Sequence, residues 1–136
     1  MKTINDVKML SFPEFGDKDH LVVIEGDKNI PFSMKRVFYI YGADKDDVRG
    51  KHANRFSEFC LINVCGTSKV RAADQMGNEK VFVLDRPNVG LYIPTMIWKD
   101  MYDFSSDSVL LVLSSEHYNA NEYINNFDEF VSGGQK

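Results

Sequence analysis

Charged and polar side chains gather at residues 49–59, where the sequence is RGKHANRFSEF. If this segment is an extended strand, alternate side chains share a face, which would put His52, Asn54 and Glu58 together. A histidine has an ordinary pKa of about 6.5, so it can accept and return a proton near neutral pH. The segment therefore indicates proton-transfer chemistry, with His52 as the candidate base.

Four cations accompany this histidine in the sequence: Arg49, Lys51, Arg55 and, much later, Lys99. Together they could surround a ligand anion such as a phosphate, beside a group that moves protons. The alternative is a solvated strand edge, where lysine is common because it discourages pairing with another chain. His52 has an ordinary alternative as well, that of a partly buried structural residue.

Part of a metal-binding pattern is also present. Small metal-binding β-barrels of the cupin type carry Gly, His-x-His and Glu in turn, with a further His on a later strand. The chain resembles that layout at His52 and Glu58, but Asn54 stands at the second His position and Lys99 at the late one. Asparagine is a weak ligand for zinc or iron, and a protonated lysine has no lone pair to donate. We therefore predict a metal-free barrel, which disfavours a metal-dependent cupin oxygenase.

The elements that must position these residues are β-strands. Short runs rich in β-branched and aromatic residues recur between clusters of Gly, Pro, Asn and Asp, a pattern typical of an antiparallel sandwich or barrel. The runs are HLVVIE, RVFYIY, EFCLINVC, SKVRA, KVFVL, VGLYIP and SVLLVLS, and GADKDD is interpreted as a hairpin loop. Only the tail has apolar residues at helical spacing, namely Tyr123, Ile124, Phe127 and Phe130, which predicts a C-terminal helix before a loose end at VSGGQK.

Length and composition fit one domain covering residues 1–136, without repeats or linkers. The net charge of -4 argues against nonspecific binding to nucleic acid or to an anionic membrane, because both need a surplus of Lys and Arg. No apolar run is long enough to span a membrane and no secretory signal is visible, so a cytoplasmic protein is expected. Two cysteines are too few for a disulfide framework, and Cys60 and Cys65 are expected to be reduced, buried thiols.

Three separated segments carry a closer resemblance: NIPFSMKRVFYIYG, then RGKHAN, then VGLYIPTMIWKDMYDFSSDSVLLVLSSEHYNANEYI. In order and spacing they resemble the sugar 3,4-ketoisomerases, metal-free cupins that act on dTDP-4-keto-6-deoxyglucose. The resemblance implies an all-β, cupin-type antiparallel jelly-roll barrel with a short C-terminal helix. It also implies a cofactor-independent homodimer that works in the cytoplasm on deoxysugars for surface polysaccharide such as lipopolysaccharide.

The reaction implied by the resemblance converts dTDP-4-keto-6-deoxyglucose to dTDP-3-keto-6-deoxyglucose. The C4 ketone acidifies the C3–H bond, so a neutral imidazole is a strong enough base, and its conjugate acid can return a proton at C4. His52 matches the family's catalytic histidine. The alternative is a non-catalytic cupin that binds a sugar nucleotide as a partner or regulatory subunit. The configuration at C4 and the nucleotide base stay open.

Five further residues are assigned to the substrate. Arg36 and Arg49 stand where the family's motifs carry arginine, whose planar fork suits a diphosphate. Asn54 is expected to hydrogen-bond a sugar hydroxyl. Lys99 is expected to support an oxyanion as a cation, because lysine shuttles protons near neutral pH only if burial lowers its pKa by several units. Tyr39 is a candidate for covering the substrate, although it alternates with Arg36 on one strand, so only one of the two can face the interior.

Overall fold

The structure is a computed structural model that describes residues 1–133. Its strands are β1 (Lys8–Ser11), β2 (Glu14–Phe15), β3 (Leu21–Val22), β4 (Arg36–Tyr41), β5 (Arg49–Asn54), β6 (Phe59–Cys65), β7 (Ser68–Ala73), β8 (Glu79–Leu84), β9 (Val89–Ile93), β10 (Trp98–Tyr102), β11 (Val109–Ser114) and β12 (Tyr123–Ile124). The helical segments are the 3₁₀ turns η1 (Ile4–Asp6) and η2 (Ala120–Glu122) and the α-helix α1 (Phe127–Val131). None of these helices is long and apolar enough to cross a membrane.

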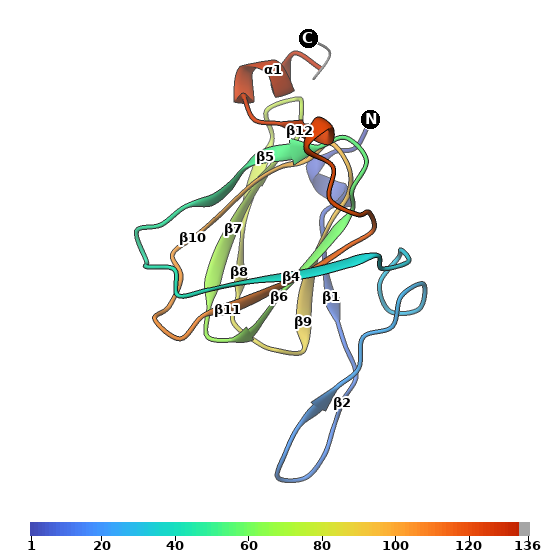
Figure 1. The fold of residues 1–136 in the computed structure, drawn as a ribbon, viewed down its shortest axis with the longest axis vertical. Coiled ribbons are helices and arrows are strands. Elements are labelled where there is room, and N and C mark those ends of the chain that lie inside the picture. Colours follow the sequence, from blue (N-terminus) through green and yellow to red (C-terminus); the bar gives the residue numbers. More distant parts are fainter. Residues whose placement is uncertain (134–136) are drawn as a thin grey trace.

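Ten of the strands form two antiparallel sheets that pack face to face (Figure 1). The first sheet has the order β1-β9-β6-β11-β4, and the second has the order β12-β5-β10-β7-β8. Their inner faces share one apolar core, to which the first sheet contributes Leu61 and Leu91 and the second contributes Val70 and Met101. The predicted all-β antiparallel barrel with one short C-terminal helix is confirmed.

The first sheet is covered on its outer face as well. Phe12, Ile30 and Phe32 from the N-terminal segment pack there against Cys60 and other side chains of β6 and β11. A strand with both faces covered needs an almost continuous apolar sequence, and FCLINVC in β6 has one. Burial raises the pKa of the Cys60 thiol to about 12, as expected for a structural cysteine.

Several details differ from the prediction. Cys65 is exposed at the end of β6, not buried. The predicted C-terminal helix is only the five residues of α1, because Tyr123 and Ile124 belong to β12 and pair with Asn54 and Ala53 of β5. Asn126 separates the two elements, since its side chain accepts a hydrogen bond from the Glu129 amide and thereby caps the start of α1.

One predicted loop and one predicted strand also need correction. GADKDD is not a hairpin loop, because it leads from β4 in the first sheet to β5 in the second. Of HLVVIE, only β3 is a strand, and it pairs with β2 in a hairpin that projects from the barrel at the end opposite α1 (Figure 1). The last three residues of VSGGQK lie outside the described part of the chain.

Candidate active site

A pocket of about 200 Å³ lies between the two sheets and contains four of the six predicted site residues. Arg36 comes from β4, Arg49 and His52 from β5, and Lys99 from β10, above a floor of apolar side chains. A larger hollow of about 670 Å³ between the loops at residues 42–46 and 103–106 is lined by several Asp side chains. Because those carboxylates would repel a phosphorylated ligand, the smaller pocket is the candidate site.

A β-bulge explains how Arg49 and His52 face the same pocket. On β10, Lys99 and Asp100 are consecutive, but their partners on β5 are His52 and Gly50, so β5 carries one extra residue, Lys51. Strict alternation would have placed Arg49 and His52 on opposite faces of the sheet, and the extra residue removes this mismatch. Lys51 itself lines a different, outer hollow and is absent from the candidate site.

Backbone geometry at the bulge requires glycine. Gly50 has φ +88° and Lys51 has φ +58°, both in the left-handed region. A Cβ added to Gly50 would lie 2.8 Å from the Lys99 carbonyl oxygen and 3.0 Å from Met101 Cε. The close approach of β5 to β10 at this point therefore depends on the absence of a side chain.

The tautomer of His52 follows from its backbone contact. Its Nδ1 lies 2.9 Å from the Gly50 carbonyl oxygen, which can only accept a hydrogen bond, so Nδ1 carries the proton and Nε2 keeps a free lone pair. The Tyr123 ring packs against the imidazole with 4.7 Å between ring centroids. Burial, helped by the positive charge of Lys99, lowers the pKa of His52 to about 4. His52 is therefore a neutral imidazole at physiological pH.

Lys99 is buried at the side of this histidine, with 3% of its surface exposed. Its Nζ donates to Asn54 Oδ1 at 2.9 Å and lies 4.5 Å from the centre of the Phe59 ring. Burial lowers the pKa of Lys99 to about 7, although the nearby Glu122 carboxylate acts in the opposite direction. The expectation that Lys99 acts as a cation depended on its pKa not being lowered strongly by burial, and burial does lower that pKa here. The sequence pattern did not reveal that the ammonium group would be enclosed.

Asn54 lies behind Lys99 and is not among the side chains that line the pocket, so its predicted contact with the sugar stays a prediction. It is 1% exposed, and its Nδ2 is buried without a hydrogen-bond partner of good geometry. The amide nevertheless helps to hold down the pKa of the neighbouring Glu122 carboxyl, so it lies between that carboxylate and the ammonium of Lys99. Its contact within the site is therefore with Lys99.

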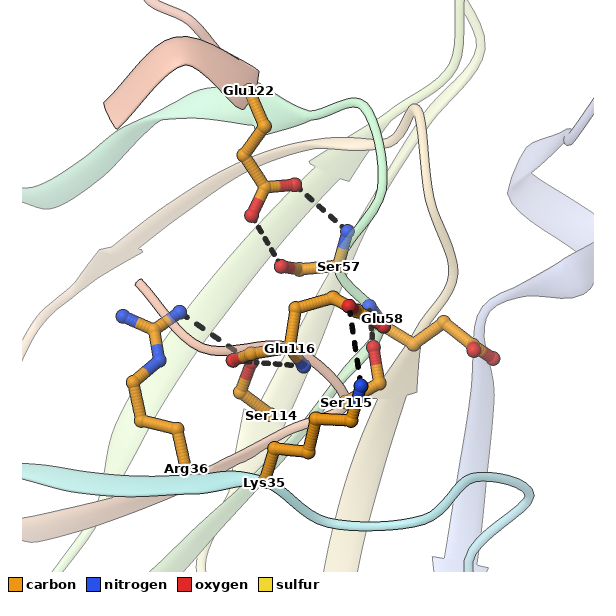
Figure 2. A network of polar contacts seen from close by, with 8 residues as sticks. All are labelled: Lys35, Arg36, Ser57, Glu58, Ser114, Ser115, Glu116 and Glu122. Carbon is orange, nitrogen blue, oxygen red and sulfur yellow. Dashed lines mark hydrogen bonds and ion pairs between the residues drawn. The ribbon is translucent and has the colours of Figure 1, made fainter. Parts of the chain in front are cut away.

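Glu122, which sequence reasoning missed, provides a buried negative charge (Figure 2). Burial alone would raise the pKa of its carboxyl. The hydrogen bonds that it accepts from the Ser57 hydroxyl and from the Phe56 and Ser57 amides outweigh burial and lower that pKa. The sequence NANEYI contains no pattern that indicates a buried carboxylate. The helix predicted for this segment also gave no reason to expect one.

Arg36 is held at the opposite wall with part of its hydrogen-bonding capacity unused. Its Nη2 lies 3.4 Å from the Ser114 hydroxyl, which is itself fixed by the backbone of Glu116 (Figure 2). The guanidinium also lies over the rings of Phe38 and Tyr118, at 5.0 and 5.7 Å from their centroids. Within residues 1–133, Arg36 Nε is buried and has no hydrogen-bond partner, so the guanidinium keeps an N–H group that can donate to an anion.

Two predicted residues lie elsewhere. Tyr39 is 61% exposed on the outer face of β4 and stacks on Tyr41, so of the two alternating sets on this strand the one with Arg36 faces the pocket. The predicted substrate contact of Tyr39 is therefore not part of this pocket. Arg55 pairs with Glu129 at 3.9 Å, away from the site.

Across residues 1–133, no three His, Cys, Asp or Glu side chains are grouped so that they could hold a metal ion.

Two antiparallel sheets packed around a pocket of this kind define a cupin-type barrel. A crystal structure of dTDP-4-dehydrorhamnose 3,5-epimerase from Bacillus anthracis has the same fold, with a TM-score of 0.77 over 90% of this chain and 81% of that one. At 16% identity this likeness establishes the fold alone. The family model described as "FdtA: WxcM-like, C-terminal" matches residues 5–134. The protein therefore belongs to the FdtA family.

Relatives at higher identity are 3,4-ketoisomerases. The chain is 40% identical to the TDP-4-oxo-6-deoxy-alpha-D-glucose-3,4-oxoisomerase of Aneurinibacillus thermoaerophilus, over 90% of this chain and 88% of that protein. A histidine-to-asparagine variant of the 3,4-ketoisomerase QdtA from Thermoanaerobacterium thermosaccharolyticum, in complex with TDP-4-keto-6-deoxyglucose, matches with 40% identity and a TM-score of 0.91, over 95% and 94% of the two chains. WlaRB, a TDP-quinovose 3,4-ketoisomerase from Campylobacter jejuni, matches with 37% identity and a TM-score of 0.90, over 96% and 100%.

Proposed function

We propose that this protein is a nucleotide-sugar 3,4-ketoisomerase that converts dTDP-4-keto-6-deoxyglucose to dTDP-3-keto-6-deoxyglucose without a cofactor. The observation that carries the proposal is the neutral imidazole of His52, whose free Nε2 lies in a pocket that also holds Arg36 and Arg49. The relatives named above act on such sugars, which favours catalysis over a purely binding role.

The chemistry needs one base and one acid. His52 Nε2 takes the proton from C3, the C–H electron pair forms a C3=C4 double bond, and the C4 oxygen becomes an enediolate oxyanion. A proton is then added at C4, the O3 proton passes to O4, and the O3–H electron pair forms the new C3 ketone. In its simplest form, the imidazolium of His52 is also the acid that returns the proton. The positive charge of the Lys99 ammonium group stabilises the oxyanion in a site from which water is largely excluded.

Pocket size indicates how the substrate is divided between interior and mouth. About 200 Å³ is below the roughly 300 to 1,000 Å³ of sites for drug-sized ligands, so the pocket suits a single sugar ring. The diphosphate would then lie between Arg36 and the exposed Arg49, where two guanidinium groups can make charge-assisted hydrogen bonds. Tyr118, exposed beside Arg36, offers a ring on which the nucleotide base can stack.

An NMR time course with dTDP-4-keto-6-deoxyglucose in deuterated buffer tests the function. The expected result is a new ketone carbon at C3 and deuterium at C4 of the product. If the protein binds the sugar nucleotide but leaves it unchanged, the result would contradict the proposal. It would favour the alternative of a non-catalytic cupin that binds a sugar nucleotide. The same substrate without protein is the control for spontaneous enolisation.

The active form is proposed to be a homodimer. β4 is an edge strand of the first sheet, and its outer face exposes Val37, Tyr39 and Tyr41, a row of large apolar side chains. Exposed apolar patches of this kind on a soluble protein commonly mark interfaces, and two copies of an edge strand can also pair through their backbones. At such an interface the outward-facing side chains of Tyr39 and Tyr41 would contact the second copy, whereas neither of them lines the pocket.

Changing Tyr39 to Glu should weaken self-association by about tenfold or more, because it places a charge in an apolar contact. Analytical ultracentrifugation over a dilution series measures the effect. Val83→Glu is the matched control, since Val83 is similarly exposed on β8, the edge strand of the other sheet. A wild-type protein that sediments as a monomer at all concentrations, or equal weakening by the two variants, would contradict the proposed interface.

The proposed setting is the cytoplasm, in a route that makes deoxysugars for surface polysaccharide such as lipopolysaccharide. One observation supports an interior location: Cys60 and Cys65 are both free thiols. A fusion of the protein to a fluorescent reporter, followed by cell fractionation, tests the location directly.

A further inference from the structure

We propose that Lys99 is a second catalytic residue, which donates the proton to C4 of the sugar while His52 removes the proton from C3. This inference rests on the proposed function and assigns its two proton transfers to two different groups. It replaces the simplest mechanism, in which one imidazole performs both.

Position in the sheet is the first support. His52 on β5 and Lys99 on β10 are directly opposite each other in an antiparallel pair, and both line the pocket. Such cross-strand neighbours have Cβ atoms roughly 5 Å apart. C3 and C4 are adjacent atoms of the sugar, so two groups placed side by side on one wall suit a transfer in which each group serves one carbon.

The surroundings of the ammonium group are the second support. Among residues 1–133, Lys99 Nζ has a single hydrogen-bond acceptor, the neutral amide oxygen of Asn54, and the Phe59 ring covers it on another side. No ion pair ties Lys99 to a carboxylate anywhere in residues 1–133. A group whose only role was to supply a fixed charge would be stabilised better by a direct carboxylate partner.

The charged groups that face Lys99 come from several elements. His52 projects from β5, Arg36 from β4 across the pocket, and Glu122 from η2 behind Asn54. The residues beside it on β6 and β7, Phe59 and Ala72, are apolar. Burial dominates this balance and lowers the pKa of Lys99 to about 7, so the ammonium is a much stronger acid than an ordinary lysine.

The proton balance closes without another reactant. His52 becomes an imidazolium when it takes the C3 proton, and Lys99 becomes a neutral amine when it gives a proton to C4. The O3 proton moves to O4, which leaves the sugar neutral. The imidazolium then loses its proton to solvent because its pKa is about 4, and the amine takes one up, so both groups return to their starting states.

The test separates the two steps by NMR in deuterated buffer. Deuterium that enters C3 of recovered substrate reports proton removal by His52, and 3-keto product reports proton delivery at C4. In Lys99→Met we expect product formation to fall by about 10²-fold or more, whereas deuterium entry at C3 stays within a few-fold of wild type. Lys99→Arg should behave in the same way, because arginine keeps the charge but does not release a proton near neutral pH.

Lys51→Met is the matched control, since Lys51 is the bulge residue of β5 and its side chain lies outside the pocket. Both readouts should be unchanged in it. Normal product formation in Lys99→Arg would overturn the proposal, because charge alone would then be sufficient. Equal loss of both readouts in Lys99→Met would also overturn it, and would assign Lys99 to binding. If wild type itself gives neither readout, the proposed function fails instead.

Wild-type protein provides a measurement that does not depend on the folding of a variant. Above about pH 7 the ammonium form of Lys99 is lost, whereas His52 stays neutral and able to remove the C3 proton. The ratio of product formation to C3 exchange should therefore fall by roughly tenfold per pH unit on the alkaline side. A ratio that is constant from about pH 6 to 9 would overturn the proposal.

Discussion

Replacing His52 with Asn should lower the rate of isomerisation by about 10²-fold or more, with little change in substrate binding. The substitution removes the lone pair of Nε2, which is the only proposed acceptor for the C3 proton, and a positioned base contributes on this scale. Deuterium entry at C3 should be lost together with product, which distinguishes His52 from Lys99. Initial rates by NMR and a separate titration of substrate binding measure the two effects.

His20→Asn is the matched control, because His20 is an exposed histidine in the projecting hairpin, near Glu14 and away from the pocket. It should retain wild-type activity. The pH dependence gives a second check: since the neutral imidazole is the active form, the acid-side loss of activity should occur only as the pH falls through about 4. A near-normal rate in the His52→Asn variant would contradict the assignment of His52 as the base.

Replacing Arg36 or Arg49 with Ala should weaken binding of dTDP by about 1.5 to 3 kcal/mol, which corresponds to roughly 10- to 150-fold. Each change removes a guanidinium group that is proposed to donate to the diphosphate. The larger effect is expected for Arg36, because it is held by Ser114 and its buried Nε has no hydrogen-bond partner among the described residues. Isothermal titration calorimetry with dTDP measures both.

Arg86→Ala is a suitable control for these variants, because Arg86 is exposed and pairs only weakly with the adjacent Asp85. Arg71 would be a poor control, since it makes ion pairs with Asp100 and Glu79 and its loss would disturb the second sheet. Equal weakening in all three alanine variants would show that the arginines act only through the general field of the protein.

Sequence patterns predicted most of the barrel because alternation and turn residues are local signals. RVFYIY coincides with β4, and the six other predicted runs contain or overlap strands. β10 was not among the predicted runs, because WKDMY has charged residues at positions whose burial depends on partners elsewhere in the chain. The C-terminal helix was extended too far, because a spacing of three or four residues across two separate short elements looks the same as one helix.

Residue type indicated which side chains gather at the pocket, but it did not indicate how far each of them is buried. His52, Arg36 and Arg49 line the pocket as expected. Lys99 does so too, but its proton affinity depends on enclosure by residues distant in sequence, and no local pattern reports that. Glu122 was missed for the same reason, since its charge acts on the pocket only after the tail has folded back over β5.

The extra residue in β5 means that Arg49 and His52, three positions apart in the sequence, lie in the sheet as if they were two positions apart. Deleting Lys51 would make the separation two positions in the sequence as well, so regular alternation would still put both side chains on the same face. A change that straightened the strand at unchanged length would instead turn the side chain of Arg49 away from His52. During evolution, loss of the codon for Lys51 is therefore compatible with the geometry of the site, whereas loss of the bulge at constant length would separate the proposed phosphate-binding group from the base in a single step.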